Sequence, residues 1–224
     1  MANRPALSLF VTGTDTGVGK TRVAVRLVET LRASGLRAVG FKPILCGEDR
    51  SDAEALAQAS GELDLDEINP VWLNTPAAPL SARIAGESAA AKVDRCLIID
   101  TYEALMTRFD AVIIEGAGGW EVPLTETETF AQLARSFAAP VVVVAANRLG
   151  VLNHTRLTVD AVRRDGLPCV GVLLNEISPP DPADVARRTN LEALRLSLPD
   201  IPIDPVDWND EGPFPEALRL RLFP

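Results

Sequence analysis

The feature that most constrains this chain is a glycine-rich stretch near its start, TGTDTGVGKT at residues 12–21. A short apolar run, LSLFV at residues 7–11, precedes it, and apolar residues at helical spacing follow it. This order of strand, glycine-rich turn and helix is the context of a phosphate-binding loop, or P-loop. The glycines let successive backbone N–H groups point at one anion, and the helix start adds the positive end of its dipole.

The loop is a variant of the common P-loop pattern. That pattern has glycine five positions before Gly19, where this chain has Thr14, and its Gly13 comes one position early. The variant is typical of ATPases related to nitrogenase reductase and to partition proteins. Lys20 supplies a mobile charge for the outer phosphates, and Thr21 supplies a hydroxyl suited to Mg²⁺. The alternative is a glycine-rich turn that binds nothing, which the Gly-Lys-Thr between strand and helix disfavours.

Length and composition limit the class of protein. The chain has 224 residues and is 47% hydrophobic, so we expect one α/β domain over residues 1–224. A formal net charge of −9 argues against a nucleic-acid partner. The three cysteines are widely spaced and suggest neither a disulfide framework nor a zinc site. We find no signal peptide and no apolar run of membrane-spanning length, so the sequence predicts a cytoplasmic protein without membrane contact.

Strand and helix patterns alternate along the chain. This alternation predicts a three-layer, doubly wound α/β fold with a mainly parallel sheet and a P-loop. Besides residues 7–11, strands are predicted at 37–41, 109–115, 140–145 and 167–174. Helices are predicted at residues 51–59, 80–85, 89–106, 129–138 and 182–196, and a further helix is predicted to end at residue 164. The apolar face of the helix at 89–106 is formed by Leu97, Ile98, Tyr102 and Leu105. Residues 44–50 and 69–79 are expected to be irregular, the proline-rich tail to wrap the surface, and residues 217–223 to form an edge strand or a helical turn.

Two charged residues stand at the ends of predicted strands. Lys42 follows the strand at 37–41, at the edge where open parallel sheets bind their ligands; a surface lysine is the alternative. Glu115 ends the strand at 109–115 and precedes a glycine-rich turn. An acid in this place beside a P-loop is a Walker-B arrangement, which holds Mg²⁺ directly or through water. Its alternative role is to cap a neighbouring helix.

Other polar positions have two interpretations each. Ser51 and Glu54 fit a capping box, so Asp52 is either a favourable charge in the first helical turn or a metal ligand. Asn175 follows a predicted strand and either reads a base edge with its amide or is a turn residue. The helix start at residues 150–153 could bind an anion.

Five blocks occur in an order that resembles the dethiobiotin synthetase family. They are FVTGTDT with VGKT at 10–16 and 18–21, GFKP at 40–43, EGAGGW at 115–120, LGVLNH at 149–154 and NEISPP at 175–180. The resemblance implies an ATP- and Mg²⁺-dependent condensation of 7,8-diaminononanoate with CO₂ that makes the ureido ring of dethiobiotin. It also implies a carbamic–phosphoric anhydride intermediate and a homodimer with active sites at the subunit interface.

Carried over residue by residue, the resemblance implies roles for individual positions. Lys42 is the principal catalytic residue, together with Lys20 and Thr16. Cys46 stands where many members carry a substrate-contacting serine, and Gly17 where some carry glutamate. The implied Mg²⁺ ligands are Thr21, Asp52 and Glu115. The implied nucleotide contacts are Thr16, Gly17, Val18, Gly19, Lys20, Thr21, Asp52, Glu115, Gly116, Ala117, Gly118, Asn175 and Glu176, and the implied substrate contacts are Cys46, Gly150, Val151, Leu152 and Asn153.

Three other functions compete with this one. A partition or septum-positioning switch ATPase carries a second lysine early in the loop, where this chain has Asp15 and Thr16. A cobyrinate-type amide synthase needs a glutamine amidotransferase domain, for which the chain has no room. A nucleotide-binding scaffold without turnover has no need of Lys42 and Glu115 at two strand ends.

Overall fold

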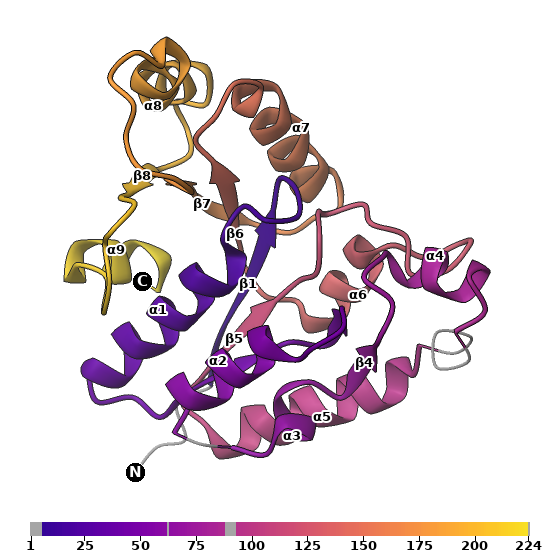
Figure 1. The fold of residues 1–224 in the computed structure, drawn as a ribbon. Coiled ribbons are helices and arrows are strands. Elements are labelled where there is room, and N and C mark those ends of the chain that lie inside the picture. The colour runs from indigo at the N-terminus through magenta and orange to yellow at the C-terminus, as the bar shows by residue number, and fades with distance from the viewer. Residues whose placement is uncertain (1–5, 62, 88–92, 224) are drawn as a thin grey trace.

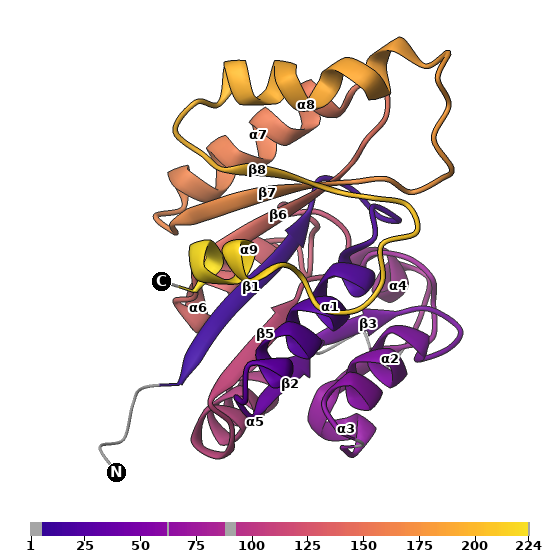
Figure 2. The same ribbon diagram turned by 90° about the vertical axis from the view of Figure 1, so that its left-hand side faces the viewer.

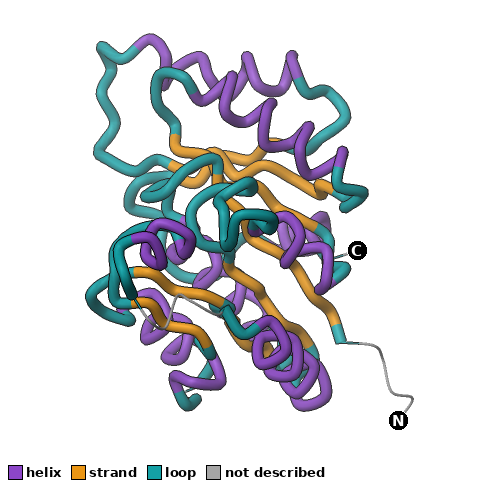
Figure 3. Tube along the Cα trace, turned by 90° about the vertical axis from the view of Figure 1, so that its right-hand side faces the viewer, coloured by secondary structure: helices purple, strands orange, loops and turns teal. Residues whose placement is uncertain are grey.

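The computed structural model describes residues 6–61, 63–87 and 93–223, and its centre is a parallel sheet (Figure 1). The strand order is β2-β5-β1-β6-β7-β8, and every pairing is parallel. Figure 3 shows the strands of this sheet as a twisted layer between helices. The predicted doubly wound α/β fold is therefore confirmed. The strands are β1 (Leu7–Gly13), β2 (Ala38–Phe41), β5 (Ala111–Glu115), β6 (Val141–Ala146), β7 (Cys169–Asn175) and β8 (Ile203–Val206).

Helices cover both faces of the sheet (Figure 2). The chain leaves β1 toward β2 and leaves β5 toward β6, which are opposite directions along the sheet. Because such crossovers are right-handed, the two directions place their helices on opposite faces. One face carries α1 (Lys20–Ala33), α2 (Ser51–Ala59) and α9 (Glu216–Leu222). The other carries α5 (Arg95–Arg108), α6 (Phe130–Phe137), α7 (Val151–Arg164) and α8 (Val185–Ser197).

The core fixes the sheet edge from which the P-loop emerges. All residues of β5 and β6 are buried, as expected for strands covered on both faces. Phe10 of β1 packs edge-on against Trp120, with 5.9 Å between ring centroids, and stacks on Phe137 of α6 at 6.1 Å. Phe41 of β2 meets Phe137 at 6.2 Å. These aromatic contacts join β1 and β2 to one helix, so the carboxyl ends of both strands are held at one edge.

Two stretches predicted as irregular contain strands. β3 (Ile44–Cys46) pairs in parallel with β4 (Val71–Leu73) as a separate two-stranded sheet. Asn69 supports it by donating from Nδ2 to the carbonyls of Lys42, at 2.8 Å, and Val71, at 2.9 Å. Strands of three residues are too short to show a period of two, so the sequence pattern missed them. Two short helices, α3 (Leu65–Ile68) and α4 (Pro79–Ile84), flank β4.

The proline-rich tail is more regular than predicted. β8 includes Pro205 and forms the edge of the sheet, where a missing N–H is tolerated. Of the two alternatives for residues 217–223, the helical turn is correct, because α9 packs on α1 and on β7. Among the described residues, no helix has both the length and the apolarity needed to cross a bilayer.

Two predictions about helices are wrong. The capping box of Ser51 and Glu54 does not form, because Ser51 is already the first helical residue and its N–H donates to the Asp49 carboxylate at 3.0 Å. In α5, Leu97 is 45% exposed, whereas the other three residues of the predicted apolar face are buried. The predicted helix start at residues 89–92 lies outside the described residues.

Candidate functional site

The P-loop links β1 to α1 and is shaped by glycines. Gly19 has φ 88°, in the left-handed region that favours glycine, and immediately precedes α1. A Cβ atom there would lie 2.2 Å from Nδ2 of Asn175. At Gly13 a Cβ atom would lie 2.9 Å from both the Asp15 carbonyl and a methyl group of Val18. Neighbouring backbone and side-chain atoms therefore leave no room for a side chain at two of the loop's glycines.

A cavity of about 370 Å³ opens at the start of α1, where the ends of β2 and β5 also meet. Lys20 of the P-loop and Lys42 after β2 both line it, so two ammonium groups share one space. Except for Leu45, every residue of its lining was a predicted site residue. The lining is Thr16, Gly17, Gly19, Lys20, Thr21, Lys42, Leu45, Cys46, Asp52, Glu115, Ala117 and Gly118.

Lys42 forms the centre of a buried charge cluster. Its Nζ lies 2.5 Å from Oε1 of Glu115 and 2.8 Å from Oδ2 of Asp52. The Thr21 hydroxyl donates to the same Oε1 at 2.8 Å. The side chain of Glu115 is fully buried and that of Lys42 is 4% exposed, while that of Asp52 is 43% exposed. Glu115 therefore serves this cluster and caps no neighbouring helix.

Burial and charge act in opposite directions on the ionisable groups of the cavity. Burial lowers the pKa of Lys20 to about 8, because its attraction to Glu115 compensates only in part. Burial also disfavours the charge of Lys42, but Glu115 and Asp52 outweigh it and raise the pKa of Lys42. For Asp52, burial is outweighed by the Lys42 ammonium, which lowers the pKa. The cavity thus favours a charged Lys42 and lowers the pKa of Lys20.

One atom of the cluster is left for a cation. Oε2 of Glu115 is buried and has no hydrogen-bond partner among the residues that the structure describes. A carboxylate oxygen without a donor is costly to bury, and oxygen is the ligand that Mg²⁺ prefers. No group of three or more His, Cys, Asp or Glu side chains gathers for a metal in the described chain. The hydroxyl of Thr21 with the carboxylates of Asp52 and Glu115 therefore fits Mg²⁺ that draws its remaining ligands from phosphates or water.

A second lobe extends the cavity away from the P-loop. It has a volume of about 280 Å³ and shares Thr16, Cys46, Ala117 and Gly118 with the first. Its other lining is apolar, formed by residues 76–79 and Val122. Burial raises the pKa of the Cys46 thiol to about 11, so this side chain is a neutral group at the junction of the two lobes.

Asn175 lies behind the P-loop and does not line the cavity. Its Nδ2 donates to the carbonyl of Val18 at 2.8 Å, and its Oδ1 accepts from Nη1 of Arg22 at 3.0 Å. The residue is 1% exposed. The carboxamide of β7 therefore holds the P-loop by its backbone, at a site 157 positions away along the chain.

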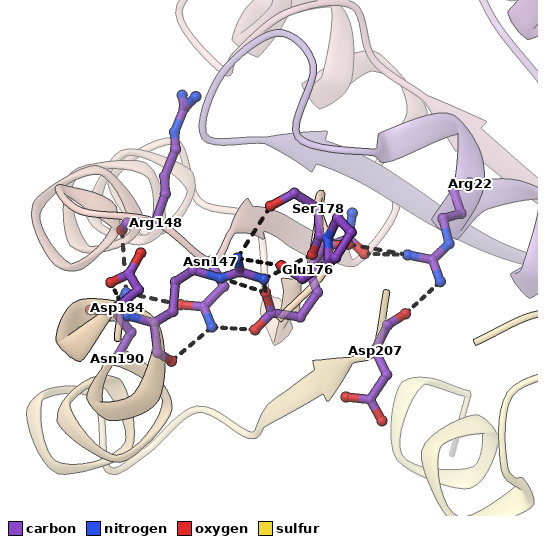
Figure 4. A network of polar contacts seen from close by, with 11 residues as sticks. Arg22, Asn147, Arg148, Glu176, Ser178, Asp184, Asn190 and Asp207 are labelled. Carbon is purple, nitrogen blue, oxygen red and sulfur yellow. Dashed lines mark hydrogen bonds and ion pairs between the residues drawn. The ribbon is translucent and has the colours of Figure 1, made fainter. Parts of the chain in front are cut away.

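The side chain of Glu176 belongs to a polar network on the same side (Figure 4). Its carboxylate accepts from Nε of Arg187 at 3.0 Å and also from Asn147, at the end of β6. Asn190 of α8 donates to Oδ1 of Asn147 at 2.9 Å. Both carboxylate oxygens thus bind protein groups, and Glu176 joins α8 to the ends of β6 and β7.

The residues at 150–153 lie at the start of α7, outside the cavity of this chain. Gly150 has φ 93° and precedes the first helical turn. Leu149 and Leu152 are exposed by 86% and 37% respectively, whereas Val151 is buried. These residues therefore do not line either lobe of the cavity within this chain.

Some predicted nucleotide contacts are buried beneath the loop. Val18 is 1% exposed, and a Cβ atom at Gly116 would lie 3.2 Å from the ring of Phe10. Sequence reasoning also missed two arginines at the loop. Arg148 forms an ion pair with Asp15 at 2.9 Å, and Arg22 contacts Asn175. The signal available for Arg22 is its place directly after the Gly-Lys-Thr of the loop.

Comparison with solved structures agrees with this fold. The fold is similar to that of the septum site-determining protein MinD from Pyrococcus horikoshii in a complex with Mg-ADP. The alignment has a TM-score of 0.54 and 15% identity, and it covers 97% of this chain and 84% of MinD. Chloroplast FtsY from Physcomitrella patens aligns with a TM-score of 0.52, 19% identity, 100% of this chain and 67% of FtsY. At these identities the likeness concerns the fold alone.

Sequence relatives are much closer. The AAA domain family model matches residues 8–203. ATP-dependent dethiobiotin synthetase BioD from Anaeromyxobacter dehalogenans is 47% identical over 199 residues, covering 84% of this chain and 88% of the relative. The enzyme of the same name from Akkermansia muciniphila is 42% identical, and the match covers 82% of this chain and 84% of the relative. The one from Aromatoleum aromaticum is 39% identical, and the match covers 95% of this chain and 96% of the relative. The chain therefore belongs to the AAA domain family and, within it, to the ATP-dependent dethiobiotin synthetases, as its sequence motifs predict.

Proposed function

We propose that this protein, as one domain over residues 1–224, uses ATP to carboxylate 7,8-diaminononanoate with CO₂ and to close the ureido ring of dethiobiotin. The observation that carries the proposal is the position of two ammonium groups. Lys20 of the P-loop and Lys42 after β2 line one cavity. A triphosphate on the first and a CO₂-derived anion on the second are then close enough to react. Membership of a family of ATP-dependent ligases in biotin synthesis supports it.

The reaction has three steps. One amine of the substrate attacks CO₂, loses a proton and becomes a carbamate. A carbamate oxygen then attacks the γ-phosphorus, and ADP leaves. The second amine attacks the carbonyl carbon of the resulting carbamic–phosphoric anhydride, closes the ring and expels phosphate.

The task of the protein is to bring two anions together. At about 4 Å, two unit negative charges repel by roughly 4 kcal/mol at an effective dielectric constant of 20. Glu115 and Asp52 raise the pKa of Lys42 more than burial lowers it, so Lys42 remains charged near the carbamate. Lys20 neutralises the outer phosphates together with the N–H groups of residues 16–21. Positioning and charge neutralisation are the main contributions that a protein makes to phosphoryl transfer.

Three residues would hold Mg²⁺: Thr21, Asp52 and Glu115. The ion would neutralise charge on the phosphate oxygens when it is bound. The Lys42 ammonium lies on the same two carboxylates, so Lys42 and the ion would share Glu115 and Asp52 as partners. From this position the ammonium of Lys42 would neutralise the carbamate.

The remaining contacts complete the substrate sites. Thr16 and Cys46 lie between the two lobes, where a short polar group of the diamine would meet them. The apolar lobe suits the hydrocarbon chain of the substrate. Its carboxylate would bind at residues 150–153 of a second copy, which makes the active unit a homodimer. We place this homodimer in the cytoplasm, with the nucleoside near Asn175 and Glu176.

Phosphate release measured with each substrate omitted in turn tests the proposal. We expect release to require both bicarbonate and the diamine, with dethiobiotin identified by mass spectrometry. Equal hydrolysis without the diamine would contradict it and would favour the switch ATPase, the alternative that shares the fold of MinD.

A further inference from the structure

Arg22 is the first residue after the P-loop, and its side chain reaches toward Asp207 and the segment of Glu176 (Figure 4). Nη1 donates to Oδ1 of Asn175 at 3.0 Å and to the carbonyl of Glu176 at 3.4 Å. Nη2 donates to the carbonyls of Asp207 at 2.5 Å and Asp210 at 2.7 Å. One planar guanidinium thus joins the P-loop helix, the end of β7 and the tail.

The tail segment that Arg22 holds is residues 207–214, here termed the tail strap. It has a second anchor one turn further along α1, at Arg26. This arginine is 3% exposed, donates to the Gly212 carbonyl at 2.7 Å, pairs with the Asp210 carboxylate at 2.9 Å and stacks on the Phe214 ring at 3.9 Å. The tail strap is therefore fixed along α1 by two arginines four residues apart, which lie on one face of the helix.

The outer phosphates are drawn to Lys20 and Thr21, which line the cavity shared with Lys42. The proposed function puts the nucleoside at the other end of the nucleotide, behind the loop and near Asn175 and Glu176. On that side the strand ends offer Asn175, the backbone of Glu176 and the tail strap.

We propose that Arg22 positions the nucleoside end of the nucleotide site by holding the Asn175 carboxamide and the tail strap in one fixed arrangement. The inference rests on the proposed use of ATP. Only a planar fork with several donors can bind four oxygens at once, so neither lysine nor an apolar side chain replaces it. A wall fixed before binding spares the ligand the cost of ordering it.

Binding of one ligand with a nucleoside and of one without it tests the inference. The ligands are the non-hydrolysable ATP analogue adenylyl imidodiphosphate and inorganic tripolyphosphate, each titrated calorimetrically with Mg²⁺ present. In Arg22→Met we expect the Kd of the analogue to rise about tenfold and that of tripolyphosphate to change by less than about twofold. Arg188→Met, on the exposed side of α8, is the matched control and should alter neither.

A second variant changes a residue of the tail strap and leaves α1 unchanged. Asp210→Asn removes the charge that pairs with Arg26 but leaves both arginines and the Asp210 carbonyl in place. We expect a smaller rise in the Kd of the analogue, again without an effect on tripolyphosphate, and a change in the fluorescence of Trp208, which lies in the tail strap. Because this variant leaves α1 intact, it keeps the test valid if Arg22→Met folds poorly.

Two outcomes would overturn the inference. Equal weakening of both ligands by Arg22→Met would mean that Arg22 supports the phosphate loop. Unchanged analogue binding in both variants would mean that the tail strap is not part of the nucleotide site. Neither result depends on ring closure, so a failure of the proposed reaction is seen separately, in the wild-type turnover assay.

Discussion

The two sides of the P-loop differ in the charge of the groups that contact it. On the side of β2 and β5, charged groups face a cavity: Lys42 lies on Glu115 and Asp52, and Oε2 of Glu115 has no partner among the described residues. On the side of β7 and β8, here termed the neutral side, the neutral carboxamide of Asn175 contacts the loop, and charged groups behind it, such as Glu176 and Arg187, are paired within the protein. The first side faces a cavity, and on the second the tail strap is tied to α1 by Arg22 and Arg26.

This contrast follows from what each side has to do. Where charge changes during a reaction, charged groups have to bind ligand as well as protein, and Lys42 shares its two carboxylates with the proposed metal site. Where a ligand is merely held, fixed neutral hydrogen bonds reduce the entropy lost on binding. The comparison predicts that variants on the charged side alter chemistry and metal binding, and that variants on the neutral side alter stability and nucleoside affinity.

The largest effect is expected at Lys42. Lys42→Gln should fold and bind ATP, but ring closure should fall about a thousandfold, because a preorganised charge is lost where negative charge develops. Dethiobiotin formation and nucleotide affinity are measured together, with Arg188→Gln as the surface control. Near-normal ring closure would remove Lys42 from its role and erase the contrast between the two sides.

A second effect concerns the exchange of cations. Glu115→Gln should weaken Mn²⁺ binding by about a hundredfold, since the oxygen donor without a partner is lost. Lys42→Gln should do the opposite in the absence of nucleotide, because its ammonium no longer competes for the same carboxylates. Titration followed by electron paramagnetic resonance measures both. Weaker Mn²⁺ binding in Lys42→Gln would show that the lysine supports the metal site.

On the neutral side we expect a loss of stability. Arg187→Met leaves Glu176 mostly buried without its ion partner, and the free energy of unfolding should fall by about 2 kcal/mol. Urea denaturation measures the change, and Arg188→Met on the same helix is the control. The double variant with Glu176→Gln should recover part of the loss. A change in Mn²⁺ affinity instead would show that the two sides are coupled.

The smallest effect lies outside both sides, at Asp110 before β5. Hydrogen bonds from Arg37 lower the pKa of Asp110 from 3.8 to about 2 in the folded protein. The resulting stabilisation is complete above about pH 4 and is lost as the pH falls from about 4 to about 2. Asp110→Asn should therefore flatten the acid limb of Tm against pH and leave nucleotide binding unchanged. An unaltered acid limb would contradict this role.

The sequence alone determined the features in which function follows from local order. A P-loop needs only neighbouring residues to take its shape, so residues 12–21 with Lys20 and Thr21 were readable directly. Lys42 and Glu115 could be placed because each ends an apolar strand, and parallel strands end at one edge of their sheet. Where local pattern carries no such rule, as in the three-residue strands β3 and β4 or the cap of Ser51, prediction failed.

Only the tertiary structure decided how the back of the loop is held. The pair of Gly19 and Asn175 and the clasp of Arg22 on the tail strap join residues more than 150 positions apart. No spacing in the sequence indicates which distant carbonyl a guanidinium will meet, because that depends on how the whole sheet brings its strand ends together. The reactive residues of the charged side can thus be identified from local sequence motifs, while the fixed contacts of the neutral side arise from the packing of the complete chain.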